Sequence, residues 1–276
     1  MEILKAILFG IVEGVTEWLP VSSTGHMILL DEFIKLNVSD EFYELFSVVI
    51  QLAAIIAVIV FYFKDIFPWG PNKSKEDTKK IFNLWGKVLV ACVPAGVIGI
   101  LFDDLLDKYL YNGIVVALTL IIYGVIFIVM ENKGFGDKHT KSMDDITYKQ
   151  AFEVGAFQVL ALIPGTSRSG ATIIGGLISG LDRKTIANFT FILAIPVMFG
   201  ASLVKLLKYI KNVGLAFTSS ELSILIVGSI VAFVVSLFII KFLIGYVRKH
   251  DFKVFGYYRI VLGIIVLLYF AVKLLA

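Results

Sequence analysis

The chain is poor in cysteine and in charge. Cys92 is its one cysteine, which excludes an intramolecular disulfide. Only 17% of its residues are charged and 58% are hydrophobic, against roughly 25% and 45–50% in an average soluble domain. The N-terminal stretch also lacks the pattern of a cleaved signal, because glutamates interrupt it, so we expect it to belong to the mature protein. This composition excludes an ordinary soluble domain.

Long uncharged runs take the place of the missing charge. Residues 113–130, 186–204 and 222–240 are each long enough to cross the hydrocarbon core of a bilayer. They are apolar all round and lack the alternation of barrel strands. The sequence therefore predicts an all-α polytopic membrane protein, with residues 1–276 forming one membrane domain.

The hydrophobic segments follow the same order twice. In each half, two short apolar stretches flank Pro20 or Pro164 and precede three longer ones. The predicted spans lie near 42–63, 85–102, 113–130, 186–204, 222–242 and 255–272. As helices, the short stretches 151–163 and 170–181 are only about 18–20 Å long, against ~30 Å of hydrocarbon. Each short pair is therefore expected to form a re-entrant helix–loop–helix that enters and leaves on one side.

Matching residues indicate that the halves are duplicates. At an offset of 144 the two prolines align, and Ser23 aligns with Ser167. This predicts two repeats, 1–135 and 148–276. Three spans per repeat is an odd number, so the second repeat is expected to be inverted. The two re-entrant tips would then meet near the midplane, as in transporter folds.

Basic residues indicate the orientation. Loops on the face opposite the N-terminus carry about twice as many Lys and Arg residues as loops on the other face. The lysine-rich face is therefore expected to be cytoplasmic, with both termini outside.

The first tip carries two carboxylates inside an apolar region, in the stretch "EGVTEWLPVSSTGH". Glu13 and Glu17 are four residues apart and therefore share one face of a helix. Two carboxylates in that position repel each other unless a metal ion, an arginine or a shared proton lies between them. Ionisable groups at membrane depth indicate function.

Three hydroxyls and a histidine follow these glutamates: Ser22, Ser23, Thr24 and His26. They precede a second helix, whose N-terminus offers free N–H groups and suits an anion. Any one hydroxyl alone is explained equally well as a helix cap. The set as a whole, beside the glutamates, favours a phosphate site in which His26 acts as acid, base or phosphate donor.

The second tip reads "PGTSRSGAT" and contains an arginine, Arg168, in an apolar region. Arg168 needs an anion, and two readings stay open: an ion pair with Glu13 or Glu17, or bidentate binding of phosphate. The neighbouring hydroxyls are candidate phosphate ligands: Ser167, Ser169 and Thr172. Gln51, a polar residue in a predicted span, is expected to line the same cavity; the alternative is a hydrogen bond that only joins two spans.

These motifs together resemble the undecaprenyl-diphosphate phosphatase family, also called UppP or BacA, along essentially the whole chain. The resemblance implies hydrolysis of the terminal phosphate of a C55 polyprenyl diphosphate in the bacterial cytoplasmic membrane, at a site reached from the outer face. The product is the lipid carrier for peptidoglycan, and raised levels confer resistance to bacitracin. The family's functional residues fall on Glu13, Glu17, Ser23, His26, Ser167, Arg168 and Thr172.

The chemistry of phosphoryl transfer agrees with that expectation. Ser23 is the expected nucleophile, activated by Glu17 or His26, and direct attack by water with His26 as base is the alternative. A divalent cation, Mg²⁺ or Ca²⁺, is expected on the hard oxygens of Glu13 and Glu17.

The expected partners are the bilayer and the C55 lipid, whose tail would lie in a groove between spans. No nucleic-acid partner is expected, and a homodimer is left open. The rival function is a polyprenyl-phosphate flippase built on the same inverted repeat. A flippase needs a binding site but no positioned nucleophile, so release of phosphate separates the two functions.

Overall fold

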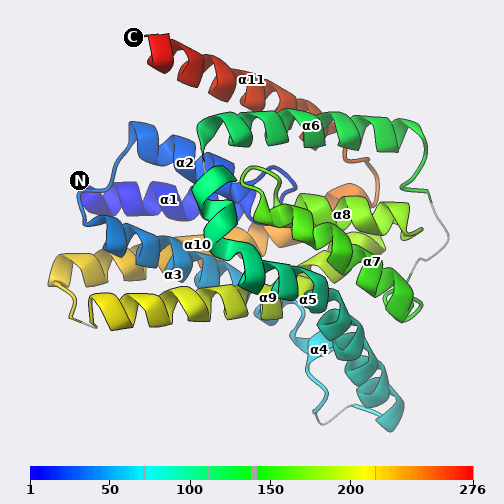
Figure 1. Cartoon of the computed structure of the whole chain (residues 1–276). Helices are drawn as coiled ribbons and strands as arrows, with labels where there is room; N and C mark the ends of the chain where they lie inside the picture. The colour runs from blue at the N-terminus through cyan, green and yellow to red at the C-terminus, as the bar shows by residue number, and fades with distance from the viewer. Residues whose placement is uncertain (71–72, 111, 138–141, 215, 276) are drawn as a thin grey trace.

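The computed structural model describes residues 1–276 except 71–72, 111, 138–141, 215 and 276, and omits the side chains of 103–108 and 274–275. The described residues form helices and no β-strand (Figure 1). In chain order they are α1 (Glu2–Thr16), α2 (Ser23–Phe33), α3 (Asp40–Phe61), α4 (Phe63–Ile66), α5 (Lys75–Leu110), α6 (Gly113–Asn132), α7 (Tyr148–Gln158), the 3₁₀ turn η1 (Val159–Leu162), α8 (Arg168–Ile178), α9 (Arg183–Asn212), α10 (Ser219–Val247) and α11 (Lys253–Leu275).

Within the described residues, six helices are long and apolar enough to cross a membrane: α3, α5, α6, α9, α10 and α11. They match the six predicted spans and confirm an all-α polytopic membrane protein. Several helices extend beyond the predicted spans, and the largest difference is at α5, which begins at Lys75 rather than near residue 85. Ser74 and Asp77 cap this end, each backbone N–H donating to the other's side chain at 3.0 Å. The cap extends the helix into the polar segment before the apolar run.

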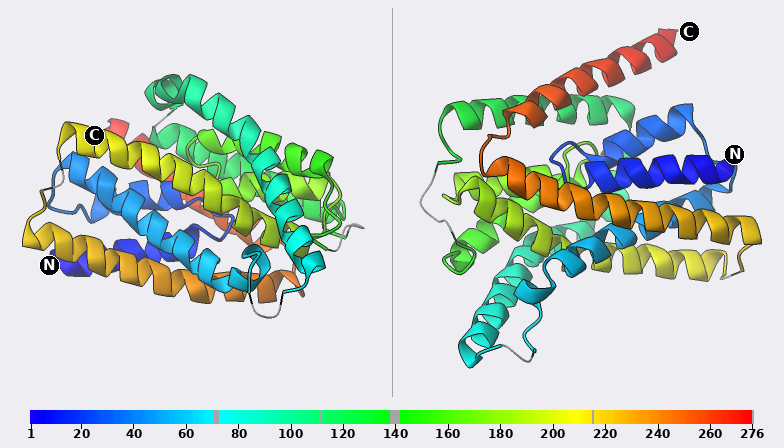
Figure 2. Two further views of the ribbon diagram at one scale, coloured as in Figure 1. Left: turned by 90° about the horizontal axis from the view of Figure 1, so that it is seen from below. Right: turned by 180° about the vertical axis from the view of Figure 1, so that it is seen from behind.

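The remaining helices are too short to span. α1 has 15 residues and α8 has 11, which is about 22 Å and 16 Å at 1.5 Å per residue. α1 runs inward from the end of the molecule where both termini lie, and α7 runs inward from the opposite end (Figures 1 and 2). The tips of the two hairpins therefore approach each other in the interior. The duplication itself stays a prediction.

Helices of one half pack on helices of the other. α1 lies along α10, α7 lies along α5, and α6 lies along α11. Small residues allow the close approach of α1 to α10: a Cβ added to Gly10 would lie 2.6 Å from the Gly228 carbonyl oxygen, and one added to Gly14 would lie 2.8 Å from that of Ala232. The hairpins are therefore held by spans from the opposite half.

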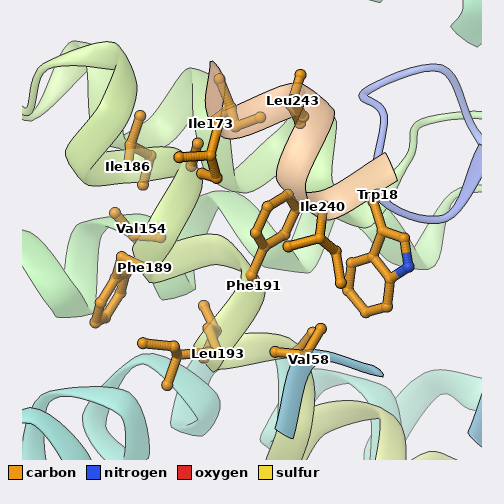
Figure 3. Packing of buried hydrophobic residues seen from close by; sticks show 14 of the residues in the cluster. Trp18, Val58, Val154, Ile173, Ile186, Phe189, Phe191, Leu193, Ile240 and Leu243 are labelled. Atoms are coloured by element: carbon orange, nitrogen blue, oxygen red, sulfur yellow. The ribbon is translucent and has the colours of Figure 1, made fainter. Parts of the chain in front are cut away.

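The largest hydrophobic cluster packs against the first tip. Figure 3 shows Trp18, Phe191 and Ile240 close together, with Val58 below them. The rings of Trp18 and Phe191 meet edge to face, with centroids 5.4 Å apart. Because Trp18 directly follows Glu17, burial of its ring anchors the backbone next to that carboxylate.

Gly155 offers a test of the contact between α7 and α5. A Cβ at this position would collide with the backbone of Ala91, which cannot rotate away. We expect Gly155→Ala to destabilise the protein by about 1–3 kcal/mol, the usual range for overpacking. The measurement is thermal unfolding in detergent. Gly96→Ala on α5 is the matched control, since a Cβ there meets nothing within 4 Å; equal melting temperatures for both variants would contradict this packing.

Candidate active site

Each tip ends in a serine that caps the following helix. Ser22 caps α2 and accepts a hydrogen bond from the Gly25 N–H at 3.3 Å, and Ser167 caps α8 and accepts one from the Gly170 N–H at 3.2 Å. The equivalent of Ser167 is therefore Ser22, not Ser23 as the offset of 144 predicted. The second loop has one more residue between its proline and its cap, and Gly165 accommodates it with a φ of 85°.

The same two serines have a rare backbone conformation. Ser22 and Ser167 have φ values of 74° and 72°, and no other described residue except glycine has a positive φ. Such a conformation costs about 1–3 kcal/mol and persists only where the surroundings enforce it. The corrected alignment also makes Ser23 and Arg168 equivalent, as the first residues of α2 and α8.

Glu17 joins these two side chains. Ser23 Oγ donates to Glu17 Oε2 at 2.6 Å, and Arg168 Nη2 donates to Glu17 Oε1 at 3.1 Å. Glu17 is 6% exposed, so its carboxylate is largely shielded from bulk water. A hydroxyl within hydrogen-bond reach of a carboxylate is the geometry of a nucleophile and its general base.

Arg168 is held on three sides. Its Nη1 donates to the Thr190 carbonyl at 2.9 Å, and its guanidinium lies 5.8 Å from the centre of the Trp18 ring. Its Nε is buried and has no partner within the described residues. The structure therefore shows the ion pair with Glu17 that the sequence left as one of two readings. Binding of phosphate by Arg168 stays a prediction.

The hydrogen-bond partners of the His26 ring among the described residues are Ser22 and Tyr258, and Ser23 is not one of them. The His26 Nδ1 lies 2.7 Å from the Ser22 carbonyl, which can only accept, so Nδ1 carries the proton. Its Nε2 lies 2.6 Å from the Tyr258 hydroxyl and, in the neutral imidazole, accepts from it. The two rings are parallel, with centroids 5.6 Å apart. Of the two bases that the sequence predicted for Ser23, Glu17 is the one in contact.

Of the two candidate metal ligands, Glu13 has a carboxylate oxygen without a hydrogen-bond partner among the described residues, whereas both oxygens of Glu17 accept hydrogen bonds. Glu13 is 4% exposed, and this oxygen is its Oε1. Neither Glu13 nor Glu17 belongs to a group of three or more His, Cys, Asp or Glu side chains among the described residues. Mg²⁺ is commonly held by one or two carboxylates together with substrate phosphates. The donors therefore fit a cation whose shell the substrate completes.

Ser169 and Thr172, both predicted to bind phosphate, make hydrogen bonds to protein groups around the tips. Ser169 Oγ lies 3.3 Å from the Leu19 carbonyl on the first tip and 3.1 Å from Ser167 Oγ. Thr172 is fully buried; its hydroxyl donates to backbone carbonyls of its own helix and accepts from Thr190 Oγ1 at 2.9 Å. In this geometry Ser169 links the tips, and Thr172 packs behind Arg168.

Thr24 and Gln51 are less well connected. Thr24 lies in the first turn of α2 and Gln51 lies in α3, both partly exposed. Neither side chain has a hydrogen bond within the part of the chain that the structure describes. Their roles as phosphate ligand and cavity lining stay predictions.

Two residues of α11 reach the site without having been predicted. Tyr258 binds His26, and Arg259 donates to carbonyl oxygens of both tips. Arg259 is 0% exposed, which is unusual for an arginine. The available signal was an arginine within the apolar run 255–272, where an ionisable residue indicates function.

The fold and the site define a class: a polytopic helical membrane protein in which two tips bring together a hydroxyl, a carboxylate and a guanidinium. Its sequence matches the family "Bacitracin resistance protein BacA" over residues 6–265. It is 59% identical over 275 residues to an undecaprenyl-diphosphatase from Enterococcus faecalis, covering 99% of this chain and 98% of the relative.

A second relative, an undecaprenyl-diphosphatase from Acetivibrio thermocellus, is 57% identical over 271 residues, 98% of each chain. One from Streptococcus thermophilus is 51% identical over 276 residues, covering 100% of this chain and 96% of the relative. The chain therefore belongs to the BacA family.

Proposed function

We propose that the two tips form the active site of an integral membrane phosphatase that converts undecaprenyl diphosphate to undecaprenyl phosphate and inorganic phosphate. The contact of Ser23 with Glu17 and of Glu17 with Arg168 carries this proposal. It brings together a hydroxyl, a carboxylate and a guanidinium, which would serve as nucleophile, base and phosphate-binding group in phosphoryl transfer.

The comparisons support a phosphatase over a flippase. Full-length relatives at 51–59% identity carry the name undecaprenyl-diphosphatase. A flippase would have no use for the short hydrogen bond between Ser23 and Glu17, because carrying a lipid requires no nucleophile. The enzyme would return the lipid carrier to cell-wall synthesis, and in doing so would confer resistance to bacitracin.

The first step begins when the terminal phosphate enters between the tips. Arg168 exchanges Glu17 for two phosphate oxygens, which a planar guanidinium binds side by side. Ser23 Oγ attacks the terminal phosphorus, Glu17 takes its proton, and the bond from that phosphorus to the bridging oxygen breaks. The electron pair leaves with undecaprenyl phosphate, and a phosphoserine remains.

Water completes the reaction in the second step. Glu17, once its proton has passed to solvent, takes a proton from the attacking water. The bond between phosphorus and Ser23 Oγ breaks, Ser23 regains a proton, and inorganic phosphate departs. Direct attack of water on the diphosphate is the competing mechanism.

A divalent cation would be held by Glu13 and Glu17. When bound, it would neutralise part of the diphosphate charge. The unpartnered Oε1 of Glu13 supports this placement. We further propose that the enzyme lies in the bacterial cytoplasmic membrane with its termini outside and its site open to the outer face. The distribution of Lys and Arg among the loops supports that orientation.

Release of inorganic phosphate by the purified protein in detergent tests the function. We expect turnover of C55 diphosphate, slower turnover of a short-chain prenyl diphosphate, and loss of both with a chelator. Added Mg²⁺ or Ca²⁺ should restore activity in the wild type and far less in Glu13→Gln. Lipid binding without any phosphate release, at any cation concentration, would favour the flippase. Full activity in chelator would exclude the requirement for a divalent cation and would leave the proposed phosphatase activity standing.

A further inference from the structure

Arg259 lies where the two tips meet. Its Nη1 donates to the Pro20 carbonyl at 3.2 Å, and its Nη2 donates to the Gly165 and Thr166 carbonyls at 2.8 and 3.0 Å. One guanidinium on α11 therefore joins the loop before α2 to the loop before α8. These bonds lie entirely in the interior, because Arg259 is fully buried.

The bonds end beside the two strained serines. Thr166 directly precedes Ser167, and Pro20 lies two residues before Ser22. The positive φ values of the two serines persist only if neighbouring contacts enforce them. Arg259 supplies such a contact to both loops at once, so it couples the geometry of one tip to that of the other.

The same bonds orient an amide toward the site. In a trans peptide the C=O and N–H point in opposite directions. Because Arg259 holds the Thr166 carbonyl, the N–H of Ser167 points away from Arg259, at the start of α8. This N–H has no partner among the described residues. Free N–H groups at a helix N-terminus bind phosphate oxygens.

The charge of Arg259 is unpaired. Within the described structure no carboxylate lies within 4 Å of it, its Nε is buried without a partner, and the Tyr123 ring lies 5.5 Å away. Burial of an unpaired cation is unfavourable. Arg168, by contrast, already has Glu17. An anionic occupant between the tips would offset the charge of Arg259.

We propose that Arg259 is a positioning residue that holds both tips in register for phosphoryl transfer and whose unpaired charge strengthens the binding of phosphate between them. The inference rests on the proposed function. Arg259 does not touch the reacting atoms: it lies behind the loops and acts through the peptide groups of the tips.

Two substitutions separate its geometry from its charge. Arg259→Lys keeps the charge but cannot span three carbonyls in a plane, so kcat should fall by roughly 10–100-fold. Inhibition by inorganic phosphate should stay within about 3-fold of wild type, since the charge remains. Arg259→Gln loses the charge as well, so the inhibition constant for phosphate should rise about 10-fold or more.

The matched controls are Arg183→Lys and Arg183→Gln. Arg183 is also an arginine in a network of contacts, bonded to Glu131 and Asp137, but away from the tips. These variants should lower the melting temperature while leaving kcat and phosphate inhibition of the folded protein unchanged. A purely structural Arg259 would behave in the same way.

The outcomes are distinct. Wild-type kcat in Arg259→Lys, unchanged phosphate inhibition in Arg259→Gln, or losses that follow the melting temperature alone would overturn the proposal. If Arg259→Gln does not fold, Arg259→Lys alone tests the proposal: a lower kcat with nearly unchanged phosphate inhibition supports it, and an unchanged kcat overturns it. A wild-type protein that releases no phosphate would instead refute the proposed function. The thermal shift with inorganic phosphate, compared between wild type and Arg259→Gln, would then still test the charge.

Discussion

Replacing Ser23 by alanine is expected to lower kcat by roughly 10³-fold or more, because the reaction loses its nucleophile and Glu17 loses the proton it accepts. The fold should persist, since among the described residues the Ser23 side chain makes one hydrogen bond, to Glu17 Oε2. Phosphate release measures the effect, and rapid acid quench followed by mass spectrometry of the wild type should detect phosphate on the Ser23 peptide.

Ser47→Ala is the matched control for this substitution. Ser47 also donates one hydrogen bond, to the Tyr43 carbonyl of its own helix, and it is not in either tip. It should keep wild-type activity. Should Ser23→Ala retain most of its kcat, and no phosphopeptide be trapped, the covalent route fails and direct attack by water replaces it.

The spans and the tips were predictable because each follows from local composition. Uncharged runs of about 20 residues indicate helices that cross a bilayer. Runs too short to cross, interrupted by Pro20 and Pro164, indicate re-entrant hairpins. The ion pair of Arg168 with Glu17 was foreseen as one of two readings, because an arginine in an apolar region needs an anion.

Which residues of the two tips are equivalent could not be predicted from the sequence. Aligned prolines suggested that Ser23 and Ser167 are equivalent, but the extra residue Gly165 shifts the second cap by one position. The cap hydrogen bonds and the positive φ of each cap residue reveal this. The choice between Glu17 and His26 as partner of Ser23 likewise depends on which way a side chain turns from its helix, and residue spacing does not contain that information.

The contacts that α11 makes with the tips could not be predicted from the sequence either. Arg259 meets the Pro20 carbonyl across 239 positions of sequence, and Tyr258 meets His26 across 232. Such contacts arise only when the last helix packs on α6 and closes over the tips. An arginine in a span predicts some function, but its partners here are backbone carbonyls, which every residue has, so no pattern of side chains identifies them.

Replacing Arg168 by alanine is expected to lower kcat/KM by roughly 10³–10⁵-fold, the range found when a transition-state arginine is removed. Alanine leaves the developing phosphate charge without its bidentate partner and leaves Glu17 buried beside Ser23 without a cation. Arg168→Lys should recover only part of the loss, since an ammonium cannot bind two oxygens side by side. Arg183→Lys, which disturbs an ion pair with Glu131 instead, should turn over normally. If Arg168→Lys were as active as that control, a single positive charge would suffice between the tips, and bidentate binding of phosphate would have no place in the mechanism.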